Sequence, residues 1–296
     1  MNNVIIVTDS CADIRKDMRE RFGIEYVQMN NVFKGKEVPA SLDWEYFPPK
    51  EIYDILRTGE RVLTTQVPVE TFEKKFTEWL DKGNDIVYLA CCVHQSGSVN
   101  TAKNVAKKLL EKYPNREIYC VDSLNASAGE ALVAIRAAMY RNEGLSAKEI
   151  FEKIEVDKSY VREFITLDTL SFLTQSGRIQ ADQTFLGDRL GVKIIITNDI
   201  EGRQVPCGKV KGRDASIQEI VKLLKANIVD PENQIIMISH ADCTEDANYL
   251  KELIEKEIPC KEIYVSYINS IVGSCVGPNT IGVWAFGTKN TFTLNK

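Results

Sequence analysis

The sequence predicts an α/β protein of two lobes, a doubly wound and mostly parallel N-terminal lobe and a mixed-sheet C-terminal lobe. Short apolar runs rich in β-branched residues alternate with helical patterns, which is typical of consecutive strand–helix units. The alternation changes near Arg162, after which two strand-like runs follow each other across a turn. A chain of 296 residues accommodates two domains of ordinary size, which we expect at 1–158 and 159–296.

The first lobe opens with the apolar run 4–7, which predicts a strand. A helix is expected within 10–21, followed by extended segments at 24–29 and 31–38. Pro48 and Pro49 are typical of a helix start and predict a helix through Leu56. The later elements expected here are a helix at 69–80, a strand at 85–90, a helix at 99–112, a strand at 118–121 and a helix rich in small residues at 126–140.

The second lobe is expected to begin with a strand at 164–167 and to continue with helices to Leu190. The runs 193–197 and 203–210 flank the turn Asn-Asp-Ile-Glu-Gly and predict paired strands. The elements expected after them are a helix at 215–226, a strand at 234–239, a helix at 245–256 and strands at 262–267 and 280–286. This order predicts a mixed sheet.

Composition and charge exclude several classes of partner. The formal net charge of −5 argues against a nucleic-acid groove and against an anionic membrane surface. No apolar stretch is long enough to span a bilayer, and the N-terminal residues lack the basic start of a signal peptide. The eight cysteines form no C-x-x-C motif, which is typical of a reducing compartment, so we expect a cytoplasmic protein.

No metal or cofactor is expected from local motifs. The two histidines, His94 and His240, do not form a metal-ligand pattern with the cysteines. The chain also lacks a P-loop and a G-x-G-x-x-G motif. We interpret His240, at the end of an expected strand, as a structural residue.

Four polar loops follow expected strands, at the edge where open α/β sheets bind ligands. They are Thr-Asp-Ser at 8–10, Thr-Thr-Gln at 64–66, Gln-Ser-Gly-Ser at 95–98 and Asp-Ser at 122–123. Because such residues are also the usual helix N-caps, a single loop has a purely structural alternative. Four in succession favour a ligand site.

The 95–98 loop is the most informative of the four. Gly97 lets the backbone approach a ligand closely, and Ser96 and Ser98 offer hydroxyl donors. The free N–H groups of the following helix suit a carboxylate or a phosphate. The alternative is that Ser98 simply caps this helix, and the two roles are compatible.

The order of these motifs resembles the DegV family of bacterial fatty-acid-binding proteins. The resemblance continues with Leu-Thr-Gln-Ser-Gly-Arg-Ile at 173–179, Ser-His-Ala-Asp at 239–242 and Gly-Ser-Cys-Val-Gly-Pro at 273–278, so it covers essentially the whole chain. It implies two α/β domains with a fatty acid between and within them. The carboxylate would then be held by Ser96 with Gly97 in one loop and by the hydroxyls of Thr64 and Thr65 in another.

The resemblance also implies a carrier rather than an enzyme. In the family, the carrier presents its bound acid to a separate fatty-acid kinase, which brings ATP and phosphorylates the carboxylate. The absence of a nucleotide motif in this chain agrees with that division of labour. The expected ligand is therefore a fatty acid, and the expected protein partner is a kinase.

Two departures from the family pattern concern the head group. The family loop usually reads T-S-Q-P-S, whereas this chain has Thr64-Thr65-Gln66-Val67-Pro68. The late family motif usually carries a histidine where this chain has Cys275, and a neutral thiol is a weak donor without charge. Carboxylate recognition or transfer to a kinase would then be weakened or redirected. The alternative is that Cys275 is simply a small buried residue.

Three basic residues of the second lobe are candidates for the ligand or the partner. Arg178 follows Gly177 at the end of an expected helix, where it either satisfies helix carbonyls or faces the ligand head or the kinase. Lys211 and Arg213, with Lys209 before them, match a basic stretch of the family that could dock a partner. A solvated strand end is the alternative.

Two other functions remain open at this point. Asp9-Ser10 after the first strand is similar to the start of serine esterases, but those need a histidine base, and neither histidine here stands in that context. The other candidate is a carrier or sensor of a different small carboxylate, not coupled to a kinase. The sequence does not exclude it.

Overall fold

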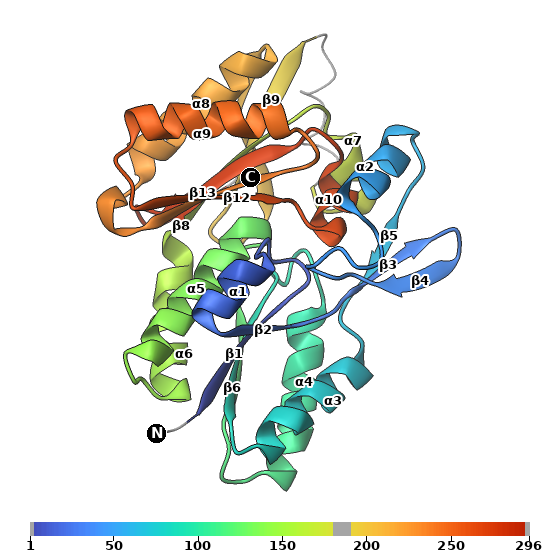
Figure 1. Cartoon of the computed structure of the whole chain (residues 1–296), viewed down its shortest axis with the longest axis vertical. Coiled ribbons are helices and arrows are strands. Elements are labelled where there is room, and N and C mark those ends of the chain that lie inside the picture. Colours follow the sequence, from blue (N-terminus) through green and yellow to red (C-terminus); the bar gives the residue numbers. More distant parts are fainter. Residues whose placement is uncertain (1–2, 180–190, 294–296) are drawn as a thin grey trace.

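The computed structural model describes residues 3–179 and 191–293. The first half of the chain builds a four-stranded parallel sheet of order β2-β1-β6-β7 (Figure 1). Its strands are β1 (Val4–Asp9), β2 (Ile24–Val27), β6 (Asp85–Ala90) and β7 (Ile118–Asp122). The parallel sheet expected from the alternation of strands and helices is confirmed.

Helices cover both faces of this sheet, because successive strand residues point to opposite sides. Ile6, Val87 and Val121 pack with one group of helices, and Val7 and Tyr88 pack with the other. The first group is α1 (Lys16–Phe22), α5 (Ser127–Asn142) and α6 (Ala147–Asp157), and the second is α3 (Val69–Asp81) and α4 (Ser98–Lys112). This arrangement is the doubly wound lobe that the sequence predicts.

A small antiparallel sheet of order β4-β3-β5 projects from the first lobe, at the right of Figure 1. It consists of β3 (Asn30–Phe33), β4 (Lys36–Pro39) and β5 (Leu63–Thr65), and α2 (Pro49–Arg57) lies between β4 and β5 in the sequence. The expected extended segment at 31–38 is therefore a hairpin whose two strands meet at Lys34 and Gly35.

The second half builds a six-stranded mixed sheet of order β10-β9-β8-β13-β11-β12. Its strands are β8 (Val161–Leu167), β9 (Val192–Asn198), β10 (Gln204–Lys211), β11 (Ile235–His240), β12 (Glu262–Tyr267) and β13 (Ile281–Phe286). The expected antiparallel pair of β9 and β10 is confirmed. The helices α8 (Arg213–Asn227) and α9 (Thr244–Glu257) pack on one face of this sheet.

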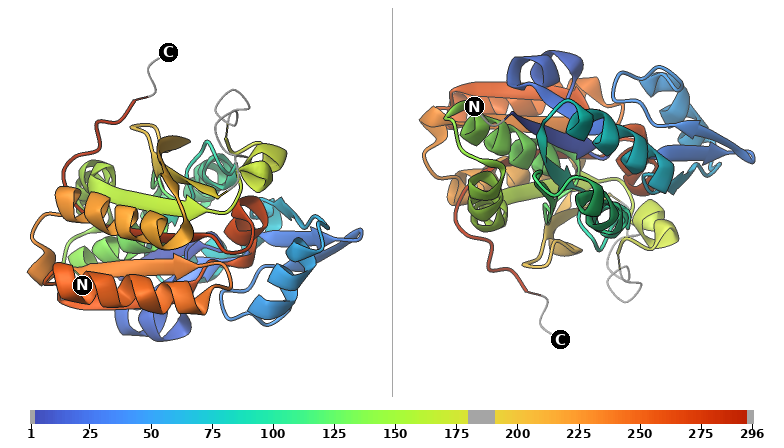
Figure 2. Two further views of the ribbon diagram at one scale, coloured as in Figure 1. Left: turned by 90° about the horizontal axis from the view of Figure 1, so that it is seen from above. Right: turned by 90° about the horizontal axis from the view of Figure 1, so that it is seen from below.

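Helix α5 lies between the two sheets (Figure 1), and the hairpin of β3 and β4 projects to one side in both views of Figure 2. It contacts β1 of the first sheet and β8, β11 and β13 of the second. Ala128, Ala131, Ala134 and Ala137 are fully buried. Small side chains are required because they let both sheets approach one helix. Tight packing therefore explains most of the small residues of this helix.

The sequence analysis missed several short elements. Helix α6 begins with a capping box in which Ser146 and Glu149 exchange hydrogen bonds, and that pattern was readable from the sequence. Helix α10 (Ser270–Val276), strand β5 and the 3-10 turns at Lys158–Tyr160 and Pro231–Asn233 were also not expected. Of the helices expected up to Leu190, α7 (Ser171–Ser176) is present, and residues 180–190 lie outside the described residues.

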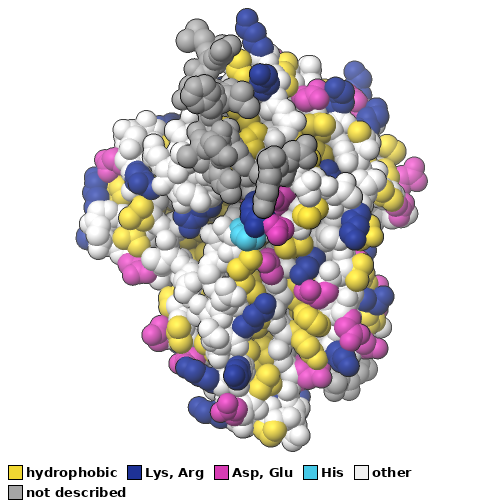
Figure 3. All heavy atoms as spheres, turned by 180° about the vertical axis from the view of Figure 1, so that it is seen from behind, with side chains coloured by type: hydrophobic (Ala, Val, Ile, Leu, Met, Phe, Trp, Pro, Cys, Tyr) yellow, Lys and Arg dark blue, Asp and Glu magenta, His cyan; other side chains and the backbone are white. Residues whose placement is uncertain are grey.

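Charged side chains of both signs are distributed over the surface. In Figure 3, lysine and arginine side chains of the described residues are interspersed with acidic ones over the face shown. Within 3–179 and 191–293, no helix is both long enough and apolar enough to cross a membrane. The division into domains at 1–158 and 159–296 remains a prediction, although the two sheets lie on either side of it in the sequence.

Candidate functional site

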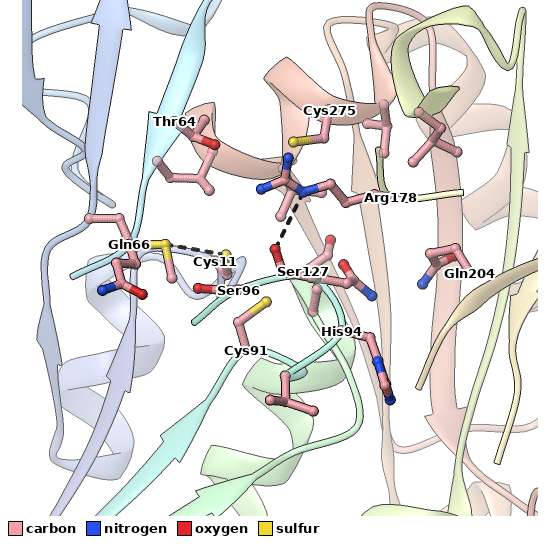
Figure 4. Close-up of a pocket in the computed structure, with 18 of the residues that line it drawn as sticks. Cys11, Thr64, Gln66, Cys91, His94, Ser96, Ser127, Arg178, Gln204 and Cys275 are labelled. Atoms are coloured by element: carbon pink, nitrogen blue, oxygen red, sulfur yellow. Dashed lines mark hydrogen bonds between the residues drawn. The ribbon is translucent and has the colours of Figure 1, made fainter. Parts of the chain in front are cut away.

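A cavity of about 410 Å³ lies between the two halves of the chain (Figure 4). Its lining includes six of the eight site residues that the sequence predicts: Thr64, Thr65, Ser96, Gly97, Arg178 and Cys275. Thr64 and Thr65 belong to β5, and Ser96 and Gly97 belong to the loop before α4. Arg178 follows α7, and Cys275 lies in α10. The cavity thus brings together segments that are far apart in the sequence.

The two ligand loops of the first half hold each other in place. The backbone N–H of Val67 donates to the hydroxyl of Ser98 at 3.2 Å, and the side-chain amide of Gln66 donates to Thr101 at 2.9 Å. A side chain on Gly97 would overlap the amide oxygen of Gln66. With a larger residue at this position, the side chain of Gln66 would have to move.

Helix α4 begins without a side-chain cap. Gly97 occupies the N-cap position, so the alternative that Ser98 caps this helix is wrong. Ser98 is fully buried inside the first turn, and its N–H donates to the hydroxyl of Ser96 at 3.3 Å. Ser96 is half-buried at the cavity, where its hydroxyl pairs with that of Ser98 at 3.0 Å and is a candidate donor to an anion.

The two threonines of β5 differ in their freedom to bind a ligand. The hydroxyl of Thr65 donates to the carboxylate of Glu37 at 3.0 Å, in an exposed position. The hydroxyl of Thr64 faces the cavity and contacts the thiol of Cys275. Thr64 is therefore the better placed of the two predicted head-group residues.

Arg178 connects the second half of the chain to the ligand loop of the first. Its Nε donates to the carbonyl oxygen of Gln95 at 3.3 Å, and its NH1 donates to the carbonyl oxygen of Ser176 at the end of α7. The guanidinium thus combines the two roles considered for it, satisfying a helix carbonyl and lining the cavity. It is a cationic donor beside the hydroxyls of Ser96 and Thr64.

Cys275 lies in α10 and lines the same cavity. Burial raises the pKa of its thiol, against the opposing charge of Arg178 and hydrogen bonds with Ser176 and Thr64. The neutral thiol therefore predominates near neutral pH, where it is only a weak donor. The position is open to the cavity, so it is not merely a residue of the hydrophobic core.

Lys211 and Arg213 lie away from the cavity. Lys211 is exposed at the end of β10. Arg213 is held by Asp246, with N···O distances of 2.9 and 2.6 Å, and by the carbonyl oxygen of Asn279 at 2.6 Å. Neither residue lines the cavity, so a role toward a partner stays a prediction, beside the alternative of a solvated strand end.

The first and fourth polar loops are structural. Ser10 is buried and its hydroxyl donates to the carbonyl oxygen of Ala40 at 2.7 Å, whereas the carboxylate of Asp122 accepts from the N–H groups of Val93 and Leu124. Neither histidine of this chain is among the hydrogen-bond partners of Ser10 in the described structure. The esterase candidate therefore lacks its base.

His240 is buried, and its Nδ1 accepts from the backbone N–H of Cys243 at 3.2 Å. Burial lowers the pKa of His240 to about 4, so the ring is neutral. This contact fits the structural role expected for it. His94, by contrast, is exposed at the rim of the cavity.

The sequence did not predict a cluster of two thiols and one carboxyl group beside the first polar loop. Cys11 and Cys91 line the cavity, and their sulfur atoms and a carboxylate oxygen of Glu130 all lie within 4.8 Å of one another. Of the described residues, this is the set that could hold a metal. Burial raises the pKa of Glu130, and the hydrogen bond of Cys11 to Cys91, together with burial, raises that of Cys11, so neutral side chains are favoured.

The residues with which the second sheet lines the cavity were also not expected from the sequence. Glu163 of β8, Gln204 of β10 and Trp284 of β13 line the cavity from there. All three are buried, and in a single sequence they read as ordinary strand residues. Nothing local distinguishes a strand residue that faces a cavity from one that faces a helix.

Comparisons with known proteins agree with this geometry. A family model described as "Uncharacterised protein, DegV family" matches residues 3–288. A DegV domain-containing protein of Clostridium perfringens is 34% identical over 287 residues, which are 97% of this chain and 98% of that protein.

Solved structures give the same result. A DegV family protein from Thermus thermophilus, described by its fatty acid binding, aligns with a TM-score of 0.86 at 27% identity over 96% of this chain and 99% of that one. DegV from Bacillus subtilis, described as a fatty acid binding protein, aligns with a TM-score of 0.82 at 27% identity over 97% and 100% of the two chains.

Proposed function

This chain belongs to the DegV family, and from that premise we propose that it binds a long-chain fatty acid with the carboxylate in the cleft between its lobes. The observation that carries the proposal is the cavity, where Ser96, Thr64 and Arg178 offer donors to one anionic group. The fatty-acid binding of two relatives of similar fold supports it.

The cavity can distinguish the two ends of such a ligand. Hydroxyl groups, the N–H groups at the start of α4 and a guanidinium favour a carboxylate at one side. Apolar and sulfur-containing side chains beside them, Met29, Leu173, Ile271 and Val276 among them, suit the methylenes. About a dozen buried methylenes at roughly 0.8 kcal/mol each give a gross gain near 10 kcal/mol, before the ordering costs.

We further propose that the protein is a carrier which presents the acid to a separate fatty-acid kinase. The hydroxyl of Ser96 pairs with that of Ser98 at 3.0 Å, and among the described residues it has neither a histidine nor a carboxylate as a hydrogen-bond partner. The exposed Lys211 lies outside the cavity, where it is available to a partner rather than to the ligand, whereas the neighbouring Arg213 is already paired with Asp246.

The direct test is to identify what the purified protein carries. Protein expressed in bacteria and purified without detergent is extracted with organic solvent, and the extract is analysed by mass spectrometry beside a mock purification. We expect stoichiometric fatty acid, and we expect the stripped protein to take up added fatty acid. Absence of both would overturn the proposal.

The second candidate is a carrier or sensor of another small carboxylate. It is favoured by the polar wall of Glu163 and Gln204, which a plain acyl chain does not match. The same extraction separates the two functions, because a non-lipid acid would remain in the aqueous phase.

A further inference from the structure

A second, smaller cavity adjoins the one described above. It has a volume of about 210 Å³, and three residues, Thr64, Arg178 and Cys275, line both cavities. Their side chains gather at one end of the larger cavity (Figure 4). The three residues therefore form a border between the two spaces, and a group bound on one side of it lies close to a group bound on the other.

This adjoining cavity is cationic. Its lining includes two arginines, Arg61 and Arg178, and no aspartate or glutamate. Among residues 3–179 and 191–293, neither guanidinium has a carboxylate as a hydrogen-bond partner. The chain as a whole has a net charge of −5, so this excess of positive charge is a local feature. A cavity lined in this way attracts an anion.

The two guanidinium groups are held by consecutive carbonyl groups at the end of α7. Nη2 of Arg61 donates to the carbonyl oxygen of Gln175 at 2.9 Å, and Nη1 of Arg178 donates to that of Ser176. Arg61 precedes β5 and is exposed, so one helix end fixes cations from both halves of the chain. Like charges held near each other repel, and an anion that binds both relieves this repulsion.

A phosphoryl group suits this pair of arginines better than a second carboxylate does. It carries a charge of about −1.5 to −2 at neutral pH and three acceptor oxygens. A guanidinium binds such oxygens through parallel N–H donors. Nε and Nη1 of Arg61 have no hydrogen-bond partner among the described residues, so these donors are available to a ligand.

We propose that the adjoining cavity is a phosphoryl site in which Arg61 and Arg178 bind a phosphate group. This inference rests on the proposed function, because it places the phosphate next to the carboxylate of the bound acid. Two ligands carry this chemistry. One is an acyl phosphate, in which the phosphoryl group is attached to the carboxylate, and the other is free phosphate bound beside the acid.

The test separates the carboxylate from the phosphoryl group. Stripped wild-type protein is titrated by calorimetry with hexadecanoic acid, with the corresponding acyl phosphonate as a stable mimic of an acyl phosphate, and with inorganic phosphate. We expect the acyl phosphonate to bind about tenfold more tightly than the acid, the effect of an added hydrogen bond between charged groups. Arg61→Gln should abolish that gain and leave the affinity for the acid unchanged, because of the two cavities Arg61 lines only the adjoining one.

Arg116→Gln is the matched control. Arg116 also donates to a backbone carbonyl, that of Gly83 at 2.6 Å, but lines neither cavity. Its variant should bind all three ligands as the wild type does. Melting temperatures of both variants, which we expect to match the wild type, check that neither is misfolded.

The outcomes distinguish the ligands and the two proposals. A phosphonate advantage that depends on Arg61 identifies an acyl phosphate, and binding of inorganic phosphate that depends on Arg61 identifies free phosphate. If Arg61→Gln binds both phosphorus compounds as tightly as the wild type, the inference is wrong and the fatty-acid function stands. If the wild type binds neither the acid nor the phosphonate, the fatty-acid function is wrong, and the titration with inorganic phosphate decides the site.

Discussion

Arg178 and Gln95 join the two halves of the protein at the cavity: the Nε of Arg178 donates to the carbonyl oxygen of Gln95 at 3.3 Å. The contact places a cation of the second half beside the loop that carries Ser96 and Gly97. Because the same guanidinium is bonded to the end of α7, its position is determined by both halves together.

Arg178→Gln should weaken fatty-acid binding by about 1.5–3 kcal/mol, the range for a hydrogen bond to a charged group. Arg61→Gln is the matched control, since Arg61 also donates to a carbonyl of α7, that of Gln175, but does not line the cavity. Affinities are measured by displacement of a fluorescent fatty acid. Equal losses in both variants would indicate a structural role for Arg178.

The hydroxyls of the head-group site should contribute unequally. Ser96→Ala and Thr64→Val should each lower affinity by about 1–3 kcal/mol, because both hydroxyls face the cavity. Thr65→Val should have a smaller effect, since that hydroxyl already donates to Glu37. Ser171→Ala on α7 serves as the control, and a larger effect of Thr65→Val than of Thr64→Val would contradict the geometry.

Cys275→His should raise phosphoryl transfer to the bound acid by a cognate fatty-acid kinase. A histidine restores the charged donor that the family carries at this position, whereas the buried thiol stays neutral. Affinity for the acid should change by no more than about 1.5–3 kcal/mol.

Acyl-phosphate formation is compared at equal lipid loading, with Cys260→His, outside the cavity, as the control. Brisk and equal turnover by wild type and Cys275→His would show that the departure is neutral. No turnover by either would argue for a carrier outside any kinase pathway.

Asp13 should make stability depend on pH between about 4 and 6. Burial raises the pKa of Asp13 to about 6, against opposing hydrogen bonds from Ser127 and Asn269. The folded state therefore holds a proton that the unfolded chain has already lost, so stability is greatest below pH 4 and falls as pH rises to 6. The fall is about 3 kcal/mol for a shift of this size.

Asp13→Asn should reduce that slope in denaturation experiments at a series of pH values, and the remainder comes from Glu130 and Glu163, whose pKa values burial also raises. Asp17→Asn provides a contrast, because the hydrogen bond from Arg15 lowers the pKa of Asp17 and the sign of its contribution is opposite. An unchanged slope in Asp13→Asn would show that other groups cause the dependence.

Gly129→Ala should destabilise the protein and alter the cavity. A Cβ at this position of α5 would lie 2.6 Å from Oδ1 of Asn125 and 3.0 Å from Cδ1 of Trp284. Overpacking of this kind costs about 1–3 kcal/mol, and displacement of Trp284 would shorten the longest acid bound. In Gly208→Ala the Cβ meets only Ile195 at 3.7 Å, so both its melting temperature and its chain-length profile should match wild type.

Most strands and helices, and the polar loops on one side of the cavity, could be predicted from local sequence patterns. Local patterns identify strands such as 85–90 and 262–267, and the polar loop with Ser96 follows a strand end, which parallel topology places at one edge of a sheet. Thr64 and Arg178 belong to motifs that are contiguous in the sequence. These features depend on neighbours within a few residues.

Which residues line the cavity depends on the packing of elements that are far apart in the sequence. Lys211 and Arg213 looked as suitable as Arg178, but the packing of β10 and α8 directs them away from the cavity. Glu163, Gln204 and Trp284 lie on three strands and meet because those strands share a sheet. Alternation along a strand determines only two faces, and the neighbouring elements decide which face borders a cavity.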